Sequence, residues 1–190
     1  MKMKGSQTEK NLLAAFAGES QARNRYTYFA SVAKKEGYEQ ISAIFLETAE
    51  NEKEHAKRFF KLLEGGDVEI TAAYPAGVIG NTAANLKAAA EGEQLEWTKL
   101  YKGFEDVARK EGFTEAADQF KEIAMVEVEH EKRYRKFLKN VKEKAVFKRE
   151  KTIKWKCRNC GRVYEGAEAP EKCPTCDHPQ AYYELLGENY

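Results

Sequence analysis

Apolar side chains recur along four long segments of the chain with the spacing of an amphipathic helix. Steps of four and three residues alternate, which places the apolar positions on one face of a helix. Gly37 and Gly112 each separate two such segments, as glycines that end helices do. The pattern therefore predicts two helical hairpins that pack as an all-α four-helix bundle, with helices at residues 8–36, 39–64, 82–111 and 114–143.

The two hairpins are copies of one unit. The sequence AKKEGY at residues 33–38 returns as ARKEGF at residues 108–113. Residues 65–81 between the copies hold five Gly or Pro and no helical pattern, so we expect a connection there. Seventeen extended residues reach roughly 56 Å, whereas a 26-residue helix is about 39 Å long, so the connection can cross the whole bundle.

Charged residues interrupt the apolar face of the second and fourth predicted helices. Glu52 and His55 have a counterpart 75 residues later in Glu127 and His130. Residues three apart lie on one face of a helix, so each pair can bind one metal ion. Buried carboxylates cost several kcal/mol unless they are paired or coordinated, so we interpret these residues as metal ligands rather than chance charges on a solvated surface. The two faces comprise Ile41, Phe45, Thr48, Glu52, His55, Phe59 and Leu62, and Ala116, Phe120, Ile123, Glu127, His130, Tyr134, Phe137 and Val141.

The other two helices carry acids at corresponding depths. Glu19 interrupts the apolar face of the first helix. On the third helix the inward face is predicted to comprise Leu86, Ala89, Glu93, Glu96 and Leu100. Glu19, Glu52, Glu93 and Glu127 fall within about a turn of the helix midpoints, so they should meet at one level of the bundle.

The repeat is broken at one position. Glu19 and Tyr26 are seven residues apart, whereas Glu93 and Tyr101 are eight apart, although the two tyrosines themselves obey the offset of 75. One added residue in a helix predicts a single π turn beside Glu96, and such turns cluster at functional sites. A shifted helix start is the alternative.

The last part of the chain has a different composition and a second metal motif. Cys157 and Cys160, then Cys173 and Cys176, form two Cys-x-x-Cys pairs separated by twelve residues, which suits one tetrahedral ion. Zinc and iron both accept four thiolates, so a zinc ribbon remains open. So short a segment cannot fold on buried surface alone, and we divide the chain into a bundle at residues 1–147 and a small metal domain at residues 148–190.

Composition narrows the class of protein. A net charge of +1 argues against a nucleic-acid-binding protein. The apolar run near the N-terminus is too short for a signal peptide or a membrane span, and four cysteines in metal-site spacing fit a reducing compartment. We therefore expect a cytoplasmic protein without a membrane partner.

The charge of the proposed ligands points to redox chemistry. Carboxylates and imidazoles suit iron or manganese. Glu19, Glu52, Glu93, Glu96 and Glu127 carry −5, so two ferrous ions, or two ferric ions with one oxide, both leave −1. Such a site can exchange two electrons with a small oxygen species without a large change in buried charge. We hypothesise that Glu96 binds the ferric form and His55 the ferrous form.

These motifs together resemble the rubrerythrin family over nearly the whole chain. The resemblance rests on the duplicated Glu-x-x-His helices, on Glu93-x-x-Glu96, and on a Cys-x-x-Cys-Gly with Cys-Pro-x-Cys tail. It implies a ferritin-like diiron bundle with a C-terminal rubredoxin-like domain of strands and loops. The implied ligands of the two non-haem irons are Glu19, Glu52, Glu93, Glu96, Glu127 and His130, with Glu52 and Glu127 bridging and His55 joining on reduction.

The resemblance also implies the remaining roles and the activity. Cys157, Cys160, Cys173 and Cys176 would bind a single iron, and Tyr26 and Tyr101 would hydrogen-bond to ligand carboxylates. The implied enzyme is a peroxidase that reduces hydrogen peroxide to water, with electrons from NAD(P)H through a reductase or rubredoxin. It would be a homodimer in which the tail iron of one subunit serves the bundle of the other. A ferritin-type ferroxidase or iron-storage protein and a scaffold with a zinc ribbon are the alternatives.

Overall fold

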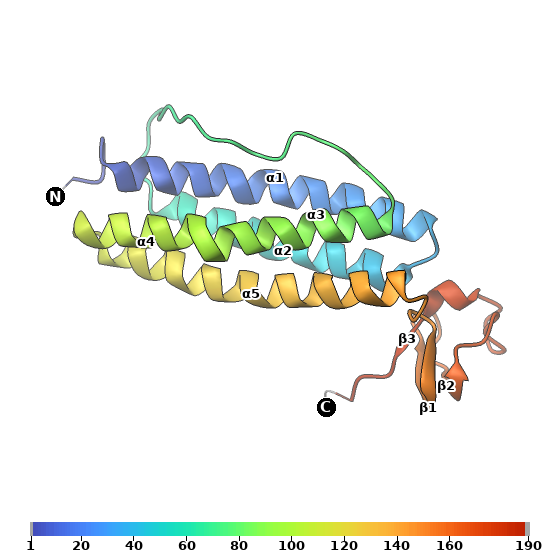
Figure 1. The fold of residues 1–190 in the computed structure, drawn as a ribbon. Coiled ribbons are helices and arrows are strands. Elements are labelled where there is room, and N and C mark those ends of the chain that lie inside the picture. Colours follow the sequence, from blue (N-terminus) through green and yellow to red (C-terminus); the bar gives the residue numbers. More distant parts are fainter. Residues whose placement is uncertain (1, 189–190) are drawn as a thin grey trace.

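The computed structural model describes residues 2–188 as a long helical bundle with a small sheet domain at one end (Figure 1). The bundle contains helices α1 Gln7–Lys35, α2 Glu39–Lys61, α3 Thr82–Leu95, α4 Tyr101–Lys110 and α5 Thr114–Lys142. A π segment, Glu96–Leu100, joins α3 to α4 into one long rod. The predicted all-α bundle is confirmed, and each predicted helix agrees with the structure to within one turn.

Local signals define the helix ends. The Ser6 side chain accepts a hydrogen bond from the Glu9 amide at 3.0 Å, which caps α1. Asn81 caps α3 in the same way, accepting from the Ala84 amide at 2.9 Å. Gly37 and Gly112 follow α1 and α4 with φ of 82° and 78°, a region that favours glycine. The two hairpin turns of the repeat therefore have the same geometry.

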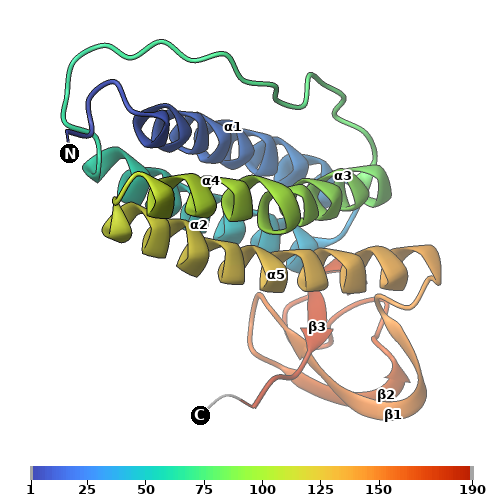
Figure 2. The same ribbon diagram turned by 60° about the vertical axis from the view of Figure 1, so that its left-hand side comes forward.

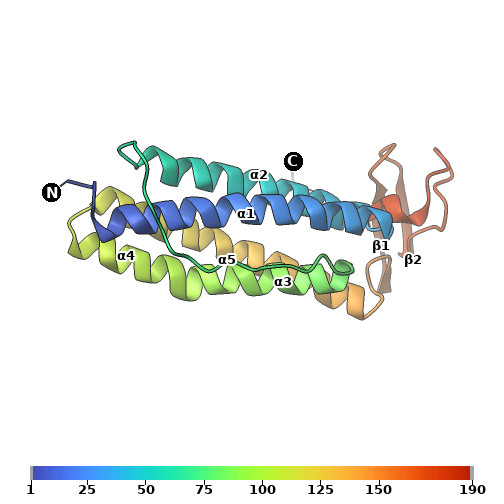
Figure 3. The same ribbon diagram turned by 90° about the horizontal axis from the view of Figure 1, so that it is seen from above.

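Residues 62–81 form the long crossover between the hairpins and contain no helix or strand. The crossover runs along the outside of the bundle from the end of α2 to the start of α3 (Figures 1 and 3). The Tyr74 hydroxyl donates to the Ala14 carbonyl at 2.7 Å and attaches it to α1. Because the chain returns to the other end before α3 begins, α2 and α3 point in the same direction.

The core of the bundle consists of two hydrophobic clusters. One contains Tyr26, Phe45 and Tyr134, and the other contains Phe59 and Phe120. On α2 and α5 the predicted ligands fall between the members of the two clusters. The polar centre is thus enclosed by apolar packing on both sides along the bundle.

The predicted π turn is confirmed, but one prediction beside it was wrong. Leu100 was expected on the inward face, whereas it is 38% exposed. The π segment Glu96–Leu100 adds a residue to the turn and rotates Leu100 out of the core. Tyr101 takes the inward position instead and is 2% exposed.

The C-terminal residues form a small antiparallel sheet with strand order β2-β1-β3. The strands are β1 Lys148–Cys157, β2 Val163–Glu168 and β3 Tyr183–Leu185, with a 3-10 turn at Gln180–Tyr182. Trp155 is fully buried, and its indole N–H donates to the Gly166 carbonyl at 3.0 Å. The sheet follows α5 and lies on the side of the bundle away from the crossover (Figure 2). Phe147, at the start of this domain, stacks on Tyr38. The boundary between residues 147 and 148 stays a prediction.

In the described part of the chain, residues 2–188, no helix is both long enough and apolar enough to cross a membrane.

We predict that Phe45→Ala lowers the free energy of unfolding by about 3–5 kcal/mol, because it removes a fully buried ring and leaves a cavity. Phe60→Ala is the matched control, since Phe60 is 58% exposed and should cost less than about 1 kcal/mol. Urea denaturation followed by circular dichroism measures both values. Equal losses for the two variants would contradict the assigned core.

Candidate metal centres

Acidic and histidine side chains from four helices converge at the middle of the bundle. They form two sets in which all the potential ligand atoms lie within 4.8 Å of one another. One set comprises Glu19, Glu52, His55 and Glu127, and the other comprises Glu52, Glu93, Glu127 and His130. Each set has one histidine, and two carboxylates belong to both sets. This is the arrangement that two neighbouring ions with shared carboxylates require.

Helix periodicity places these side chains. The i, i+3 spacing on α2 and on α5 turns a glutamate and a histidine toward the same point. Glu19 on α1 and Glu93 on α3 approach from the facing helices. All four carboxylates are at most 1% exposed. Charges buried to this degree are stable only when opposite charge is close by.

Several buried polar atoms at this centre lack hydrogen-bond partners within residues 2–188. They include both carboxylate oxygens of Glu52 and Glu127 and the Nδ1 atoms of His55 and His130. His55 Nδ1 lies 2.8 Å from a Glu52 oxygen and 2.9 Å from a Glu127 oxygen, yet these contacts lack hydrogen-bond geometry. The atoms surround common points rather than aim at one another. A cation satisfies such an arrangement, so the residues present fit metal ions.

Two buried tyrosines hold the outer carboxylates. The Tyr26 hydroxyl on α1 donates to Glu93 Oε1 at 2.5 Å, and the Tyr101 hydroxyl on α4 donates to Glu19 Oε1. The Oε2 atoms of both glutamates have no hydrogen-bond partner in the described residues. Each tyrosine therefore orients one oxygen and leaves the other available to a metal.

The pKa shifts show how strongly these groups need positive charge. Burial and neighbouring carboxylates raise the pKa of Glu19 and Glu93 well above the usual value. Burial would lower the pKa of His55 and His130, but the facing carboxylates outweigh it and raise the two values to about 10 and about 9. Burial likewise opposes ionisation of Glu127, but the two histidines lower its pKa to about 2. Protons supply the positive charge that bound ions would otherwise provide.

Glu96 lies at the start of the π segment and outside both sets. Unlike the four central carboxylates it is partly exposed. Burial of its carboxyl, followed by the charges of Glu127 and Glu52, raises its pKa to about 8. The structure therefore brings His55 into the ligand cluster and leaves Glu96 beside it.

Sequence reasoning missed the contact that fastens the π segment to α5. The Trp97 indole N–H donates to Glu131 Oε2 at 2.6 Å, and Arg135 Nε donates to Glu131 Oε1 at 2.5 Å. Glu131 is 7% exposed. The available signal was that Trp97 directly follows Glu96 and Glu131 directly follows His130, so both sit beside predicted ligands.

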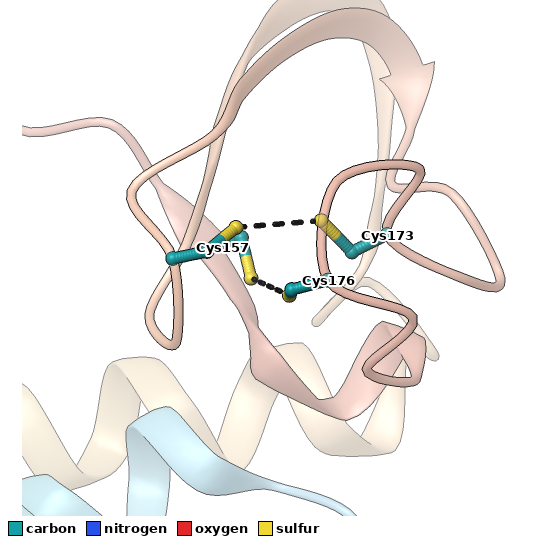
Figure 4. Close-up of side chains that lie close together, drawn as sticks. Cys157, Cys173 and Cys176 are labelled. Carbon is teal, nitrogen blue, oxygen red and sulfur yellow. Dashed lines mark hydrogen bonds between the residues drawn. The ribbon is translucent and has the colours of Figure 1, made fainter.

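The four cysteines form the second centre. Their sulfur atoms all lie within 4.8 Å of one another, and no disulfide joins them. The Cys157 and Cys176 sulfurs are 3.8 Å apart, and those of Cys160 and Cys173 are 3.6 Å apart. Figure 4 shows Cys157, Cys173 and Cys176 turned toward a common point. The neighbouring Tyr183 hydroxyl lowers the pKa of Cys173 to about 6, which favours the thiolate that metals bind.

Comparison with known families decides the identity of the chain. The family model described as rubrerythrin matches residues 10–138, and the model described as the rubredoxin-like domain of rubrerythrin matches residues 155–184. The chain belongs to the rubrerythrin family. Rubrerythrin from Porphyromonas gingivalis is 62% identical to it, over 99% of this chain and 94% of the relative. Rubrerythrin from Nitratidesulfovibrio vulgaris is 60% identical, over 99% of this chain and 98% of the relative.

Solved structures agree with this family assignment. Fully reduced, all-ferrous nigerythrin superposes with a TM-score of 0.64 at 31% identity, covering 96% of this chain and 91% of that chain. A bacterioferritin from Desulfovibrio desulfuricans superposes with a TM-score of 0.66 at 20% identity, covering 73% of this chain and 82% of that chain. At that identity the second match shows the fold alone. The ferritin-like bundle and the rubredoxin-like tail of this rubrerythrin-family chain are confirmed.

The two centres have the donor sets of the family's cofactors. The bundle offers a diiron-type carboxylate and histidine site, and the tail offers a rubredoxin-type site of four thiolates. The expected cofactors, a pair of non-haem irons and a single iron, are in accord with both donor sets.

We predict that the free energy of unfolding of the metal-free protein falls as the pH rises from about 6 to about 9. The pKa values of Glu96, His130 and His55 are raised to about 8, 9 and 10, so the folded state holds more protons than the unfolded state in this range. The contribution of these groups to the free energy of unfolding is fully present below their pKa values in the unfolded state. It is lost as the pH rises through their pKa values in the folded state. Urea titrations at both pH values measure the change.

The metal-loaded protein is the control for this experiment. Bound ions take the place of the protons, so its stability should change less over the same range. A metal-free protein that is as stable at the higher pH as at the lower one would contradict the protonated centre.

Proposed function

We propose that this protein is a non-haem diiron peroxidase that reduces hydrogen peroxide to water. The observation that carries the proposal is that a paired carboxylate and histidine site and a four-thiolate site occur in one chain of the rubrerythrin family. Iron in the paired site would supply two electrons for cleavage of the O–O bond. The four-thiolate iron would then supply electrons, one at a time, to return the paired site to its reduced state.

The roles of the individual residues follow from their placement. In this proposal Glu52 and Glu127, which belong to both sets, would each be shared by the two irons. Glu19 and His55 would be further ligands in the first set. Glu93 and His130 would be further ligands in the second set, and Glu96 would be an additional ligand from beside the two sets. Tyr26 and Tyr101 hold the outer carboxylates and keep their orientation when electrons move. The proposed tail ligands are Cys157, Cys160, Cys173 and Cys176.

His55 and Glu96 are proposed to alternate with the oxidation state. A neutral imidazole suits a ferrous ion and a carboxylate suits a ferric ion, because the added charge of the metal is then matched by the ligand. The placement of His55 within a ligand set and of Glu96 beside it supports an exchange between the two side chains. Glu96 lies on the π segment, and such turns are frequent at functional sites.

We predict that crystals of the oxidised protein will show Glu96 bound to iron, whereas crystals of the dithionite-reduced protein will show His55 bound in its place. The physical reason is the charge match of carboxylate with ferric iron. Refined iron positions and ligand distances in the two states measure the exchange. An identical ligand set in both crystals would rule it out.

The electron supply is proposed on the same basis. A reductase that draws on NAD(P)H, or a rubredoxin, would reduce the tail iron. The tail lies beyond one end of the bundle (Figure 1). The carboxylates come from positions near the middle of the helices. We therefore propose a homodimer in which the tail of one subunit approaches the bundle of the other. The four free thiols of the tail site support a reducing, cytoplasmic environment.

A ferritin-type ferroxidase is the alternative favoured by the likeness to bacterioferritin. It requires the same carboxylate helices but no thiolate electron carrier. Gel filtration separates a small oligomer from a large storage cage. Ferric iron in four thiolates is red, whereas a zinc ribbon is colourless, so the colour of the purified protein distinguishes a structural tail from an electron carrier.

We predict that the reduced protein is oxidised faster by hydrogen peroxide than by oxygen in stopped-flow mixing. The reason is that hydrogen peroxide needs two electrons to reach water, which the paired site can deliver in one encounter, whereas oxygen needs four. Absorbance of the ferric centres follows the reaction. Faster oxidation by oxygen would identify an oxidase instead.

Cys160→Ser separates the two centres in this experiment. Cys160 is exposed and belongs to the tail site, far from the carboxylates. The variant should keep single-turnover oxidation of the chemically reduced bundle and lose steady-state turnover with the reductase. Steady-state turnover unchanged from the wild type would show that the tail carries no electrons.

A further inference from the structure

A large trough lies between the crossover and the helices it covers. It has a volume of about 1280 Å³ and is bounded by residues 67–75 of the crossover, by α1, and by α3 with α4. Glu96, Tyr26 and Tyr101 contribute to its lining. Figure 3 shows the crossover running along the bundle over α1 and α3. The trough therefore connects the outside of the bundle with the one acid of the centre that is partly exposed.

Apolar side chains flank Glu96 inside this trough. Leu95 is 46% exposed and Leu100 is 38% exposed, and both line it together with Phe104. Neither side chain belongs to the core of the bundle, and the π segment turns Leu100 away from that core. Large apolar groups exposed inside a concave surface are typical of ligand sites.

The crossover side of the trough is attached to α1, and a glycine on α3 leaves space on the helix side. Tyr74 donates to the Ala14 carbonyl, and its ring lies 3.6 Å from the position of a β-carbon at Gly18. A β-carbon at Gly92, one turn before Glu96, would meet no atom within 4 Å beyond the backbone of its own helix. The crossover thus stands off from α3 and leaves room directly beside Glu96.

The trough is larger than hydrogen peroxide requires. A water molecule occupies about 30 Å³ in the liquid, and pockets for organic ligands hold roughly 300–1,000 Å³. A second hollow reaches His130 from the other face, but it is smaller, at about 520 Å³, and its lining includes Glu129, Lys132 and Arg133. In the trough, by contrast, the apolar side chains Leu95, Leu100 and Phe104 lie in the same lining as Glu96.

We propose that the trough binds the hydrocarbon group of an organic hydroperoxide and places its O–O bond beside Glu96. This inference rests on the proposed peroxidase function. The O–O bond breaks, two electrons and two protons are taken up, and an alcohol and a water molecule leave. A reduced iron pair held by the bundle ligands would supply the two electrons, and the protons would come from solvent. Leu95, Leu100 and the crossover select the organic group.

The first test measures binding without turnover. Cumyl alcohol, the product expected from cumene hydroperoxide, is titrated into the oxidised full-length protein in a calorimeter. The expected result is saturable binding at one site per chain. Absence of binding at millimolar alcohol would overturn the inference.

The second test fills the trough. Gly92→Leu places an isobutyl group in the open space beside Glu96, and Gly103→Leu makes the same change at an exposed helical glycine outside the trough. With Gly92→Leu, alcohol binding and the ratio of kcat/KM for cumene hydroperoxide to that for hydrogen peroxide should each fall about tenfold or more. Gly103→Leu should match the wild type in both. Equal behaviour of the two variants would overturn the inference.

The outcomes separate this inference from the proposed function. Reduction of hydrogen peroxide without reduction of cumene hydroperoxide would refute the organic substrate and leave the peroxidase intact. Failure to reduce either peroxide would refute both. If Gly92→Leu does not fold, alcohol binding to the wild-type protein still decides the matter.

Discussion

Four buried carboxylates at the middle of the bundle are the constraint on which the rest of this structure depends. Ions of like charge at such depth repel one another and lose their hydration, so the fold has to supply positive charge and hydrogen bonds there. Two histidines, two tyrosines and the geometry of a metal pair meet that need. The two hydrophobic clusters on either side keep water away and hold the helices at the separation that the ligands require.

The duplicated hairpin explains the symmetry of the bundle centre, and the π segment is the place where the two halves differ. Each half contributes one Glu-x-x-His pair and one tyrosine that reaches the glutamate of the other half. The π segment exists in the second half alone among the described residues, and it turns Glu96 and Leu100 toward the crossover. The centre is consequently closed on most sides and open beside Glu96. Beside Glu96 the duplicated site is therefore open to the trough under the crossover, and a smaller hollow reaches His130 from the other face.

The chain keeps two kinds of metal chemistry apart. Oxygen and nitrogen ligands at the bundle centre suit hard ions that react with peroxide, whereas four sulfur ligands suit an iron that only transfers electrons. The sheet that carries the sulfurs is stabilised by Trp155 and by the metal site rather than by a large core. Its position at the end of the bundle separates the electron carrier from the site of reaction within one chain (Figure 1).

Most of this architecture was determined by the sequence itself. Helical periodicity, the offset of 75 residues and the cysteine spacing are local signals, so they predicted the helices, the π turn and the residues that converge at both centres. The inward placement of Leu100 was predicted wrongly, because a helical wheel does not include the rotation that a π turn introduces. The Trp97 contact with Glu131, the position of Glu96 outside the ligand sets and the trough under the crossover were decided only by tertiary structure. They depend on how segments far apart in the chain approach one another in space. The residue spacing within one segment carries no information about that approach.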